Sequence, residues 1–403
     1  MNKNFSSNLV CSICHRAIEN SPNEDGNPYS VRDSSPVICN ECAQRLYNNM
    51  QIAEDAYFEQ FDNESDYRKY FKIKPLQEII TNAKQIVIGQ DKQIQSIATT
   101  IYKNVLYSNP KTKSNMILIG KTGTGKTETM TVLASEFGIP YVIVDATQYT
   151  EEGYVGRSAD DMLVDLIGRS GDNIEKAKRG ILIIDEGDKK GGYNDDITKD
   201  VSGRAVQQAL LKILEGSDIF IDSKRFKGFF DTRYLTIVFV GAFENAYIAR
   251  KNRLKPSQKI GFGTEKKDTI TKSFNFITED LIKSGFEKEF IGRFDLIIEM
   301  NVLGVEDVIK IITKSSKSPL QYYIKLLDNL GVKIYYSHDV IKNIAQEALK
   351  YDTGARAIKS IITYMFLNVL NEVISYPGKY ESVTLRPNIV FDNTKYILRT
   401  SLK

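Results

Sequence analysis

From residue 75 onward, the spacing of hydrophobic positions alternates between that of buried strands and that of amphipathic helices. Short aliphatic and β-branched runs predict strands at 116–119, 141–144, 181–185 and 235–240. Helical spacing predicts helices over 91–107, after Ser158 and over 202–214. This alternation predicts an α/β fold, with a parallel sheet between two layers of helices.

The pattern changes after residue 301, where apolar residues follow a mostly helical period over 305–312, 340–349 and 357–373. At 403 residues the chain is too long for one ordinary core. We therefore expect a small N-terminal domain over 1–50, a linker over 51–74, a large α/β domain over 75–300 and a helix-rich domain over 301–403. The linker is acidic, and its charges predict a solvated face.

Composition and charge restrict the class of protein. The 42% hydrophobic and 26% charged residues are typical of globular proteins, and a net charge of +3 gives no electrostatic case for nucleic acid as a partner. No apolar run approaches the length of a membrane span, and the first ten residues lack the apolar core of a signal peptide. These observations predict a cytoplasmic protein without a membrane partner.

A glycine-rich loop follows the strand predicted at 116–119. It has the pattern G-x-x-x-x-G-K-[ST] and consists of Gly120, Lys121, Thr122, Gly123, Thr124, Gly125, Lys126 and Thr127. In such a phosphate-binding loop, backbone N–H groups surround the phosphates, the lysine reaches the β and γ oxygens, and the hydroxyl holds Mg²⁺. The loop predicts binding of ATP with Mg²⁺.

Two carboxylates end the strand predicted at 181–185. Asp185 is placed to complete the Mg²⁺ shell, and Glu186 to polarise the attacking water. Together with the loop, this pair predicts hydrolysis of the bound nucleotide.

All four cysteines lie near the N-terminus in two C-x-x-C pairs, Cys11 with Cys14 and Cys39 with Cys42. This spacing predicts a tetrahedral zinc site, which would hold together a segment too short for a core of its own. Two disulfides are the competing interpretation, and they require an oxidising compartment. His15 is a further candidate ligand, although four thiolates already fill the shell.

The order of these motifs resembles that of the ClpX family of AAA+ protein unfoldases over nearly the whole chain. Further strings are similar to family motifs: Val87-Ile88-Gly89-Gln90, Glu152-Gly153-Tyr154-Val155-Gly156, Val206-Gln207-Gln208-Ala209-Leu210-Leu211-Lys212, Glu289-Phe290-Ile291-Gly292-Arg293 and Thr353-Gly354-Ala355-Arg356. The HslU unfoldases share the ATPase plan but lack an N-terminal zinc domain, so they match less well.

The resemblance implies roles for residues outside the two nucleotide motifs. Val87 and Ile88 would pack near the adenine, and Arg293 would reach the γ-phosphate held by a neighbouring subunit, which requires a ring, in this family a homo-hexamer. Arg356 would sense the nucleotide from the second domain.

The resemblance also implies a function for two further segments. Tyr154 and Val155 lie between glycines and would line a central pore, where a bulky ring can grip many kinds of unfolded chain. Ile260, Gly261 and Phe262 would dock on a ClpP-type peptidase ring. Tagged or unfolded proteins and their adaptors would be the substrates.

The sequence departs from the family in several places. The usual Arg-Lys-His loop contains Lys224, Arg225 and Lys227 without a histidine, which leaves the tag preference open. Gly187 stands where an apolar residue is usual, and Arg204 where a glutamate is usual. The stretch Gly241-Ala242-Phe243 offers no polar side chain for a first nucleotide sensor.

Two other functions remain in competition. A free-standing remodelling chaperone would have the same ATPase and pore, and only the tripeptide at 260–262 separates it from a peptidase partner. A nucleotide-regulated binding module would have little need for Glu186, Arg293 and Arg356 together. A peptidase is excluded, because no serine, cysteine or histidine constellation for peptide cleavage is visible.

Overall fold

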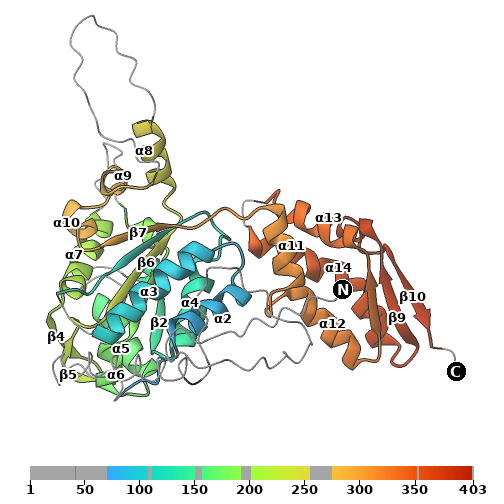
Figure 1. Cartoon of the computed structure of the whole chain (residues 1–403), viewed down its shortest axis with the longest axis horizontal. Helices are drawn as coiled ribbons and strands as arrows, with labels where there is room; N and C mark the ends of the chain where they lie inside the picture. The colour runs from blue at the N-terminus through green and yellow to red at the C-terminus, as the bar shows by residue number, and fades with distance from the viewer. Residues whose placement is uncertain are drawn as a thin grey trace, which may run out of the picture. The chain divides into compact units, whose positions relative to one another are not determined.

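The computed structural model describes residues 41, 70–107, 111–149, 157–191, 201–254, 275–351 and 354–401. Residues 67–403 form one compact unit, and all of the elements below belong to it (Figure 1). The candidate zinc ligands Cys11, Cys14, Cys39 and Cys42 lie outside the described residues, as do residues 150–156 and 255–274.

The centre of the unit is a five-stranded parallel sheet. Its strands, in spatial order, are β2 (Tyr141–Asp145), β3 (Ile181–Asp185), β6 (Thr236–Gly241), β1 (Met116–Ile119) and β7 (Leu296–Glu299). β1 pairs with both β6 and β7, so that Met116 is opposite Val238 on one side and Leu296 on the other. The loop after β1 and the carboxylates after β3 therefore emerge at the same edge of the sheet, where ligands bind in this class of fold.

Alternate residues of the strands enter two different cores. In β1, Ile117 and Ile119 belong to one core, and Met116 and Leu118 to the other. The first core contains α5 (Ala159–Arg169), α7 (Val201–Glu215) and α10 (Lys288–Ile291). The second contains α2 (Leu76–Ile86), α3 (Asp91–Tyr107) and α4 (Lys126–Phe137), which Figure 1 shows together in blue and cyan. Burial on both faces explains why the strands are continuously apolar.

A third core follows residue 302. It is built by α11 (Val305–Thr313), α12 (Pro319–Asn329), α13 (His338–Ala348) and α14 (Ala355–Ser375). Beside them lies a three-stranded sheet in the order β10 (Tyr396–Thr400), β9 (Tyr380–Leu385) and β8 (Lys333–Tyr336). β9 is antiparallel to β10 and parallel to β8.

Helix α14 is long and apolar enough to cross a membrane by length and composition, contrary to the expectation that no apolar run approaches that length. Its apolar residues recur at helical spacing, and those from Ala357 to Val373 on one face are buried in the third core. Burial in a core accounts for this composition, so α14 is weak evidence for a membrane span.

The sequence pattern located the helix at 91–107 and four of the five strands of the large sheet to within two residues. It did not predict β7, the hairpin of β4 (Asp218–Asp222) and β5 (Lys227–Asp231), or the sheet of the small domain. The hairpin was not predicted because half of its residues are exposed, so that no clear hydrophobic pattern marks it. The remaining helices are α6 (Ile174–Lys178), α8 (Glu244–Leu254) and α9 (Thr278–Ile282).

An aromatic cluster explains the unusual Gly187. Phe239 of β6 lies at the centre of the cluster, with its ring centroid 5.2 Å from that of Phe290 and 5.9 Å from that of Phe286. A Cβ atom on Gly187 would come within 2.5 Å of the Phe239 ring. The ring therefore occupies the volume that an apolar side chain at position 187 would need.

Gly187→Ala adds one methyl group against this ring. We expect the free energy of unfolding to fall by about 1–3 kcal/mol, because an overpacked core must move either the ring or the backbone. Urea unfolding followed by far-ultraviolet circular dichroism measures the change.

Gly304→Ala is the matched control, since a Cβ atom there would meet only the Asp307 carboxylate, at an ordinary 3.7 Å. Adding Phe239→Leu to Gly187→Ala should cost less than the sum of the two single substitutions, because the smaller side chain frees the space. Equal stability of the Gly187→Ala and Gly304→Ala proteins would contradict this account of the packing.

Candidate functional site

The glycine-rich loop connects β1 to α4, as the sequence predicted. Gly125, the residue before α4, has a φ of 87°, in the left-handed region that side chains with a Cβ atom rarely adopt. This conformation turns the chain sharply into the helix, so the N-terminus of α4 and its free N–H groups face the loop. The loop is thus shaped for an anion such as a phosphate.

Lys126 begins α4, and its side chain is bound by the loop itself. The Nζ atom donates hydrogen bonds to the carbonyl oxygens of Gly120 (2.6 Å) and Lys121 (3.0 Å). Burial lowers the pKa of Lys126, while the charges of Asp185 and Asp188 act in the opposite direction. The ammonium group is therefore held at the mouth of the loop by carbonyl groups that a phosphate can replace.

Thr127 and Asp185 bring the two nucleotide motifs into contact. The Thr127 hydroxyl donates a hydrogen bond to Oδ2 of Asp185 at 2.7 Å, although the two residues are 58 positions apart in the chain. A hydroxyl and a carboxylate oxygen are ligands that suit Mg²⁺. The chemistry of this pair fits the Mg²⁺ that accompanies ATP.

Glu186 follows at the end of β3 in a left-handed conformation, with a φ of 52°. Its N–H donates to Oδ1 of Asp185 at 2.9 Å, so the same carboxylate orients both Thr127 and Glu186. Asp185 and Glu186 line a hollow of about 230 Å³, to which the Arg157–Asp165 ion pair also contributes. Glu186 thus borders an open space next to Asp185.

Sequence reasoning gave no role to Asp188 and Gln90, two residues that hold this edge of the sheet together. Oδ1 of Asp188 accepts a hydrogen bond from the N–H of Ala242 (3.2 Å) at the end of β6, where no polar side chain of the strand was available. The Gln90 amide is buried and donates to the carbonyl oxygens of Thr124 (3.0 Å) and Asn301 (2.9 Å). A lone polar residue beside a motif is too weak a signal to have revealed either role.

Val87 lies against the phosphate loop, and Ile88 is the next residue along the chain. Val87 is buried, and its Cγ1 is 4.0 Å from where a Cβ atom on Gly125 would be. Ile88 is half-buried. Val87 is thus close to the phosphate loop.

The start of α14 touches the phosphate loop. The Ala355 N–H donates to the carbonyl oxygen of Gly123 at 3.2 Å. Gly354 approaches so closely that a Cβ atom there would lie 2.9 Å from the same oxygen. Arg356 follows on the first turn of α14, and its charge contributes to the lowered pKa of Lys126. The sensing arginine proposed from the sequence is therefore close to the loop.

Arg293 lies at the opposite end of the sheet. Its carbonyl oxygen accepts a hydrogen bond from the side chain of Asn115, the residue before β1, whereas the phosphate loop follows the other end of that strand. Four residues of strand separate these ends by about 13 Å. The half-exposed guanidinium pairs with Glu215 at the end of α7. Arg293 therefore does not belong to the nucleotide site of its own chain.

The remaining candidates lie outside the described residues: Tyr154 and Val155 of the pore segment, and Ile260, Gly261 and Phe262 of the docking segment. Within the described ranges, no group of three or more His, Cys, Asp or Glu side chains could hold a metal ion. The cysteines were not part of that set, so the zinc prediction is not tested.

Lys224 and Arg225 lie in the turn of the β4–β5 hairpin, and Lys227 begins β5. Arg225 makes two contacts with the carboxylate of Asp172 (2.6 and 3.2 Å), and Lys227 pairs with Asp222 (2.8 Å). Two of the three cations are thus already engaged with carboxylates of the same chain. Arg204 is exposed on α7, and nothing in the structure explains its presence there.

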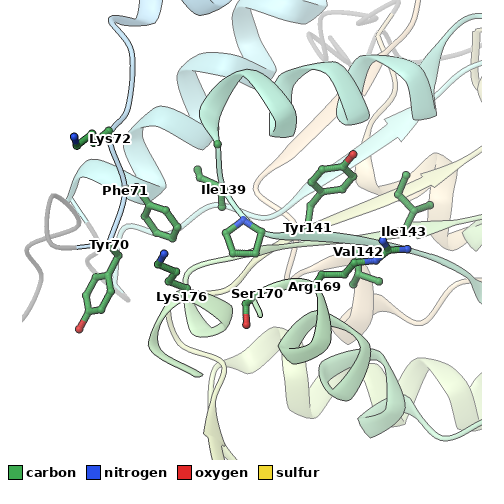
Figure 2. A pocket seen from close by; sticks show the side chains of 12 residues that line it. Tyr70, Phe71, Lys72, Ile139, Tyr141, Val142, Ile143, Arg169, Ser170 and Lys176 are labelled. Atoms are coloured by element: carbon green, nitrogen blue, oxygen red, sulfur yellow. The ribbon is translucent and has the colours of Figure 1, made fainter. Parts of the chain in front are cut away.

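A larger hollow, of about 790 Å³, lies away from the phosphate loop (Figure 2). It is lined by Tyr70, Phe71 and Lys72, by residues 138–143 leading into β2, and by Arg169, Ser170 and Lys176. These residues lie at the beginning of β2, whereas the nucleotide motifs follow the ends of strands. No residue of either nucleotide motif lines it.

Comparison with known proteins agrees with this geometry. Residues 111–297 match the family model described as AAA domain (Cdc48 subfamily), and residues 303–382 match the C-terminal, D2-small domain, of ClpB protein. The first match spans the phosphate loop and Arg293, and the second spans most of the third core.

Curated relatives include proteins named ATP-dependent Clp protease ATP-binding subunit ClpX, from two strains of Bacteroides fragilis and from Bacteroides thetaiotaomicron. Each is 32% identical to this chain over 397 residues. The aligned part covers 93% of this chain and 93%, 93% and 94% of the three relatives.

The relatives extend over almost the full chain, and the residues of the hydrolytic site are brought together by the fold. The departures at Gly187 and Arg204 mark a divergent sequence. The chain therefore belongs to the ClpX family of AAA+ ATPases, and it hydrolyses ATP without being a peptidase itself.

Proposed function

We propose that this protein is the ATP-driven unfolding subunit of a two-component protease. In this proposal a homo-hexamer in the cytoplasm unfolds protein substrates, translocates them through its pore and delivers them to a ClpP-type peptidase. The observation that carries the proposal is the separation of Arg293 from its own phosphate loop, at the far end of β1. An ATPase site that needs this arginine must be completed by a second subunit, and a ring meets that need at every site.

Each residue of the nucleotide site has a separate proposed role in hydrolysis. Lys126 and the N-terminus of α4 would bind the phosphates, and Thr127 with Asp185 would hold Mg²⁺, which offsets the charge of the phosphate oxygens. Glu186 would accept a proton from the water that attacks the γ-phosphorus while the bond to the bridging oxygen breaks. Arg293 of the adjacent subunit would stabilise the charge that develops, an effect worth roughly 10³–10⁵ in rate in related systems.

The small domain provides a route from chemistry to motion. We propose the division at about residue 300 that the sequence suggested, with Val87 and Ile88 holding the adenine on the side of the large domain. Gly354 and Ala355 contact the phosphate loop directly, and Arg356 lies in the first turn of the long core helix of the small domain. Loss of the γ-phosphate on hydrolysis would therefore shift the start of α14, and the helix would move as a rigid body and carry the small domain with it.

Tyr154 and Val155 are proposed to grip the substrate in the pore. Tyr154→Ala should leave ATP hydrolysis within about two-fold of the unmodified protein, because position 154 lies outside both nucleotide motifs, and it should abolish unfolding of a fluorescent model substrate. The two rates are measured on the same ring preparation. Equal loss of hydrolysis and unfolding would contradict the assignment to the pore.

Ile260, Gly261 and Phe262 are proposed to dock on the peptidase. We expect the purified protein, with Mg²⁺ and a slowly hydrolysed ATP analogue, to co-sediment with a ClpP ring, and deletion of 260–262 to remove co-sedimentation while ATPase activity stays unchanged. Failure of the full-length ring to bind ClpP would favour the free-standing remodelling chaperone, which needs no peptidase.

Zinc is proposed to hold the N-terminal segment together, and the two C-x-x-C pairs support this proposal. We expect about one zinc per chain by elemental analysis, and loss of the metal in Cys14→Ser, because three thiolates bind zinc less tightly than four. The ATPase activity of residues 67–403 gives the control. A metal-free protein with two disulfides would contradict the proposal.

A further inference from the structure

Gln207 is a fully buried glutamine in the first half of α7. Its Nε2 donates a hydrogen bond to the carbonyl oxygen of Lys190 at 2.7 Å, and its Oε1 accepts one from the N–H of Glu287 at 3.0 Å. The donor and the acceptor of the same side-chain amide are thus both engaged. The proposed function makes no use of this residue.

The two partners belong to the two functional segments of the ATPase domain. Lys190 ends the short 3₁₀ helix Gly187–Lys190, which follows Glu186 directly. Glu287 precedes α10, and Arg293 follows the end of α10 by two residues. One amide group therefore joins the segment that carries the proposed catalytic carboxylate to the segment that carries the proposed trans arginine.

Neighbouring contacts fix both ends of this connection. Nζ of Lys190 donates to the carbonyl oxygen of Tyr149 at 3.0 Å, which holds the 3₁₀ helix from its other side. At the far end of α7, Glu215 pairs with Arg293 itself. Helix α7 thus contacts the Glu186 segment near its beginning and the Arg293 segment at both Gln207 and Glu215.

The chemistry at this position requires an amide. Lys190 offers a carbonyl acceptor and Glu287 an N–H donor, so the bridging side chain must donate on one side and accept on the other. An ionised glutamate lacks the donor, and a methionine of similar length lacks both groups. Leaving a buried backbone group without its partner destabilises the folded state.

We propose that Gln207 is a positioning residue that couples the two nucleotide sites served by one subunit. Through its amide, the position of the Glu186 segment at a subunit's own site determines the position of the Arg293 segment that serves the adjacent site. The inference rests on the proposed role of Arg293 in trans. Gln207 does not touch nucleotide, so its substitution alters the rate of hydrolysis rather than the affinity for ATP.

The test is a double-mutant cycle on the full-length ring, with Gln207→Met, Arg293→Ala and the combination. We expect Gln207→Met to lower kcat for ATP by about ten-fold, because a loss near 1.4 kcal/mol changes a rate by that factor. The Kd for a fluorescent, slowly hydrolysed ATP analogue should stay within about two-fold. In the Arg293→Ala background, Gln207→Met should lower the single-turnover rate by less than about two-fold, since the group it positions is gone.

Gln208→Met is the matched control, because it is the same substitution on the neighbouring, exposed residue of the same helix. It should leave kcat unchanged. If Gln207→Met does not fold, Gln207→Asn provides the second variant, since it keeps an uncharged amide and its shorter side chain separates that amide from the two backbone partners.

The outcomes separate the two proposals. An effect of Gln207→Met that is equally large with and without Arg293, or an unchanged kcat, would overturn the coupling while leaving the trans arginine intact. A ten-fold weaker binding of the analogue would also overturn it, because a positioning residue does not set affinity. Full activity of Arg293→Ala would overturn the proposed function and, with it, the coupling.

Discussion

The hydrogen bond between Thr127 and Asp185 is the contact on which the nucleotide site depends. It spans 2.7 Å and joins the phosphate loop, after β1, to the carboxylates, after β3, across the end of β6. The contact is possible only because parallel strands bring the ends of distant segments to one edge of a sheet. Asp185 also accepts a hydrogen bond from the N–H of Glu186, so one carboxylate positions both the proposed Mg²⁺ ligands and the proposed base.

Three further contacts hold this edge of the sheet. Gln90 donates a hydrogen bond to the backbone of the loop, Asp188 ties the Glu186 segment to the end of β6, and Gly354 brings α14 against Gly123. Each contact fixes the relative position of two particular backbone segments. The hydrophobic packing in the two cores of the large domain, by contrast, has no preferred direction. The cores supply stability, and these few polar contacts position the chemistry.

Much of the large domain could be predicted from the sequence, because its strands are buried on both faces and stand out as continuous apolar runs. The phosphate loop and Asp185 could be predicted too, since their chemistry demands fixed residues at fixed spacing. The half-exposed strands of the β4–β5 hairpin and of the small sheet carry no such pattern. The contacts of Gln207 could not be predicted either, because its partners lie 17 and 80 residues away and contribute only backbone atoms, which are the same in every residue type.

The central claim is that each nucleotide site is completed by an arginine from a second subunit. A structure of the full-length protein with Mg²⁺ and a slowly hydrolysed ATP analogue tests it most directly. The account predicts a ring in which Lys126 has exchanged the carbonyl oxygens of Gly120 and Lys121 for phosphate oxygens, and Arg293 has left Glu215 for the γ-phosphate of the adjacent subunit. Arg293 still paired with Glu215 and distant from every nucleotide in a fully loaded ring would contradict it.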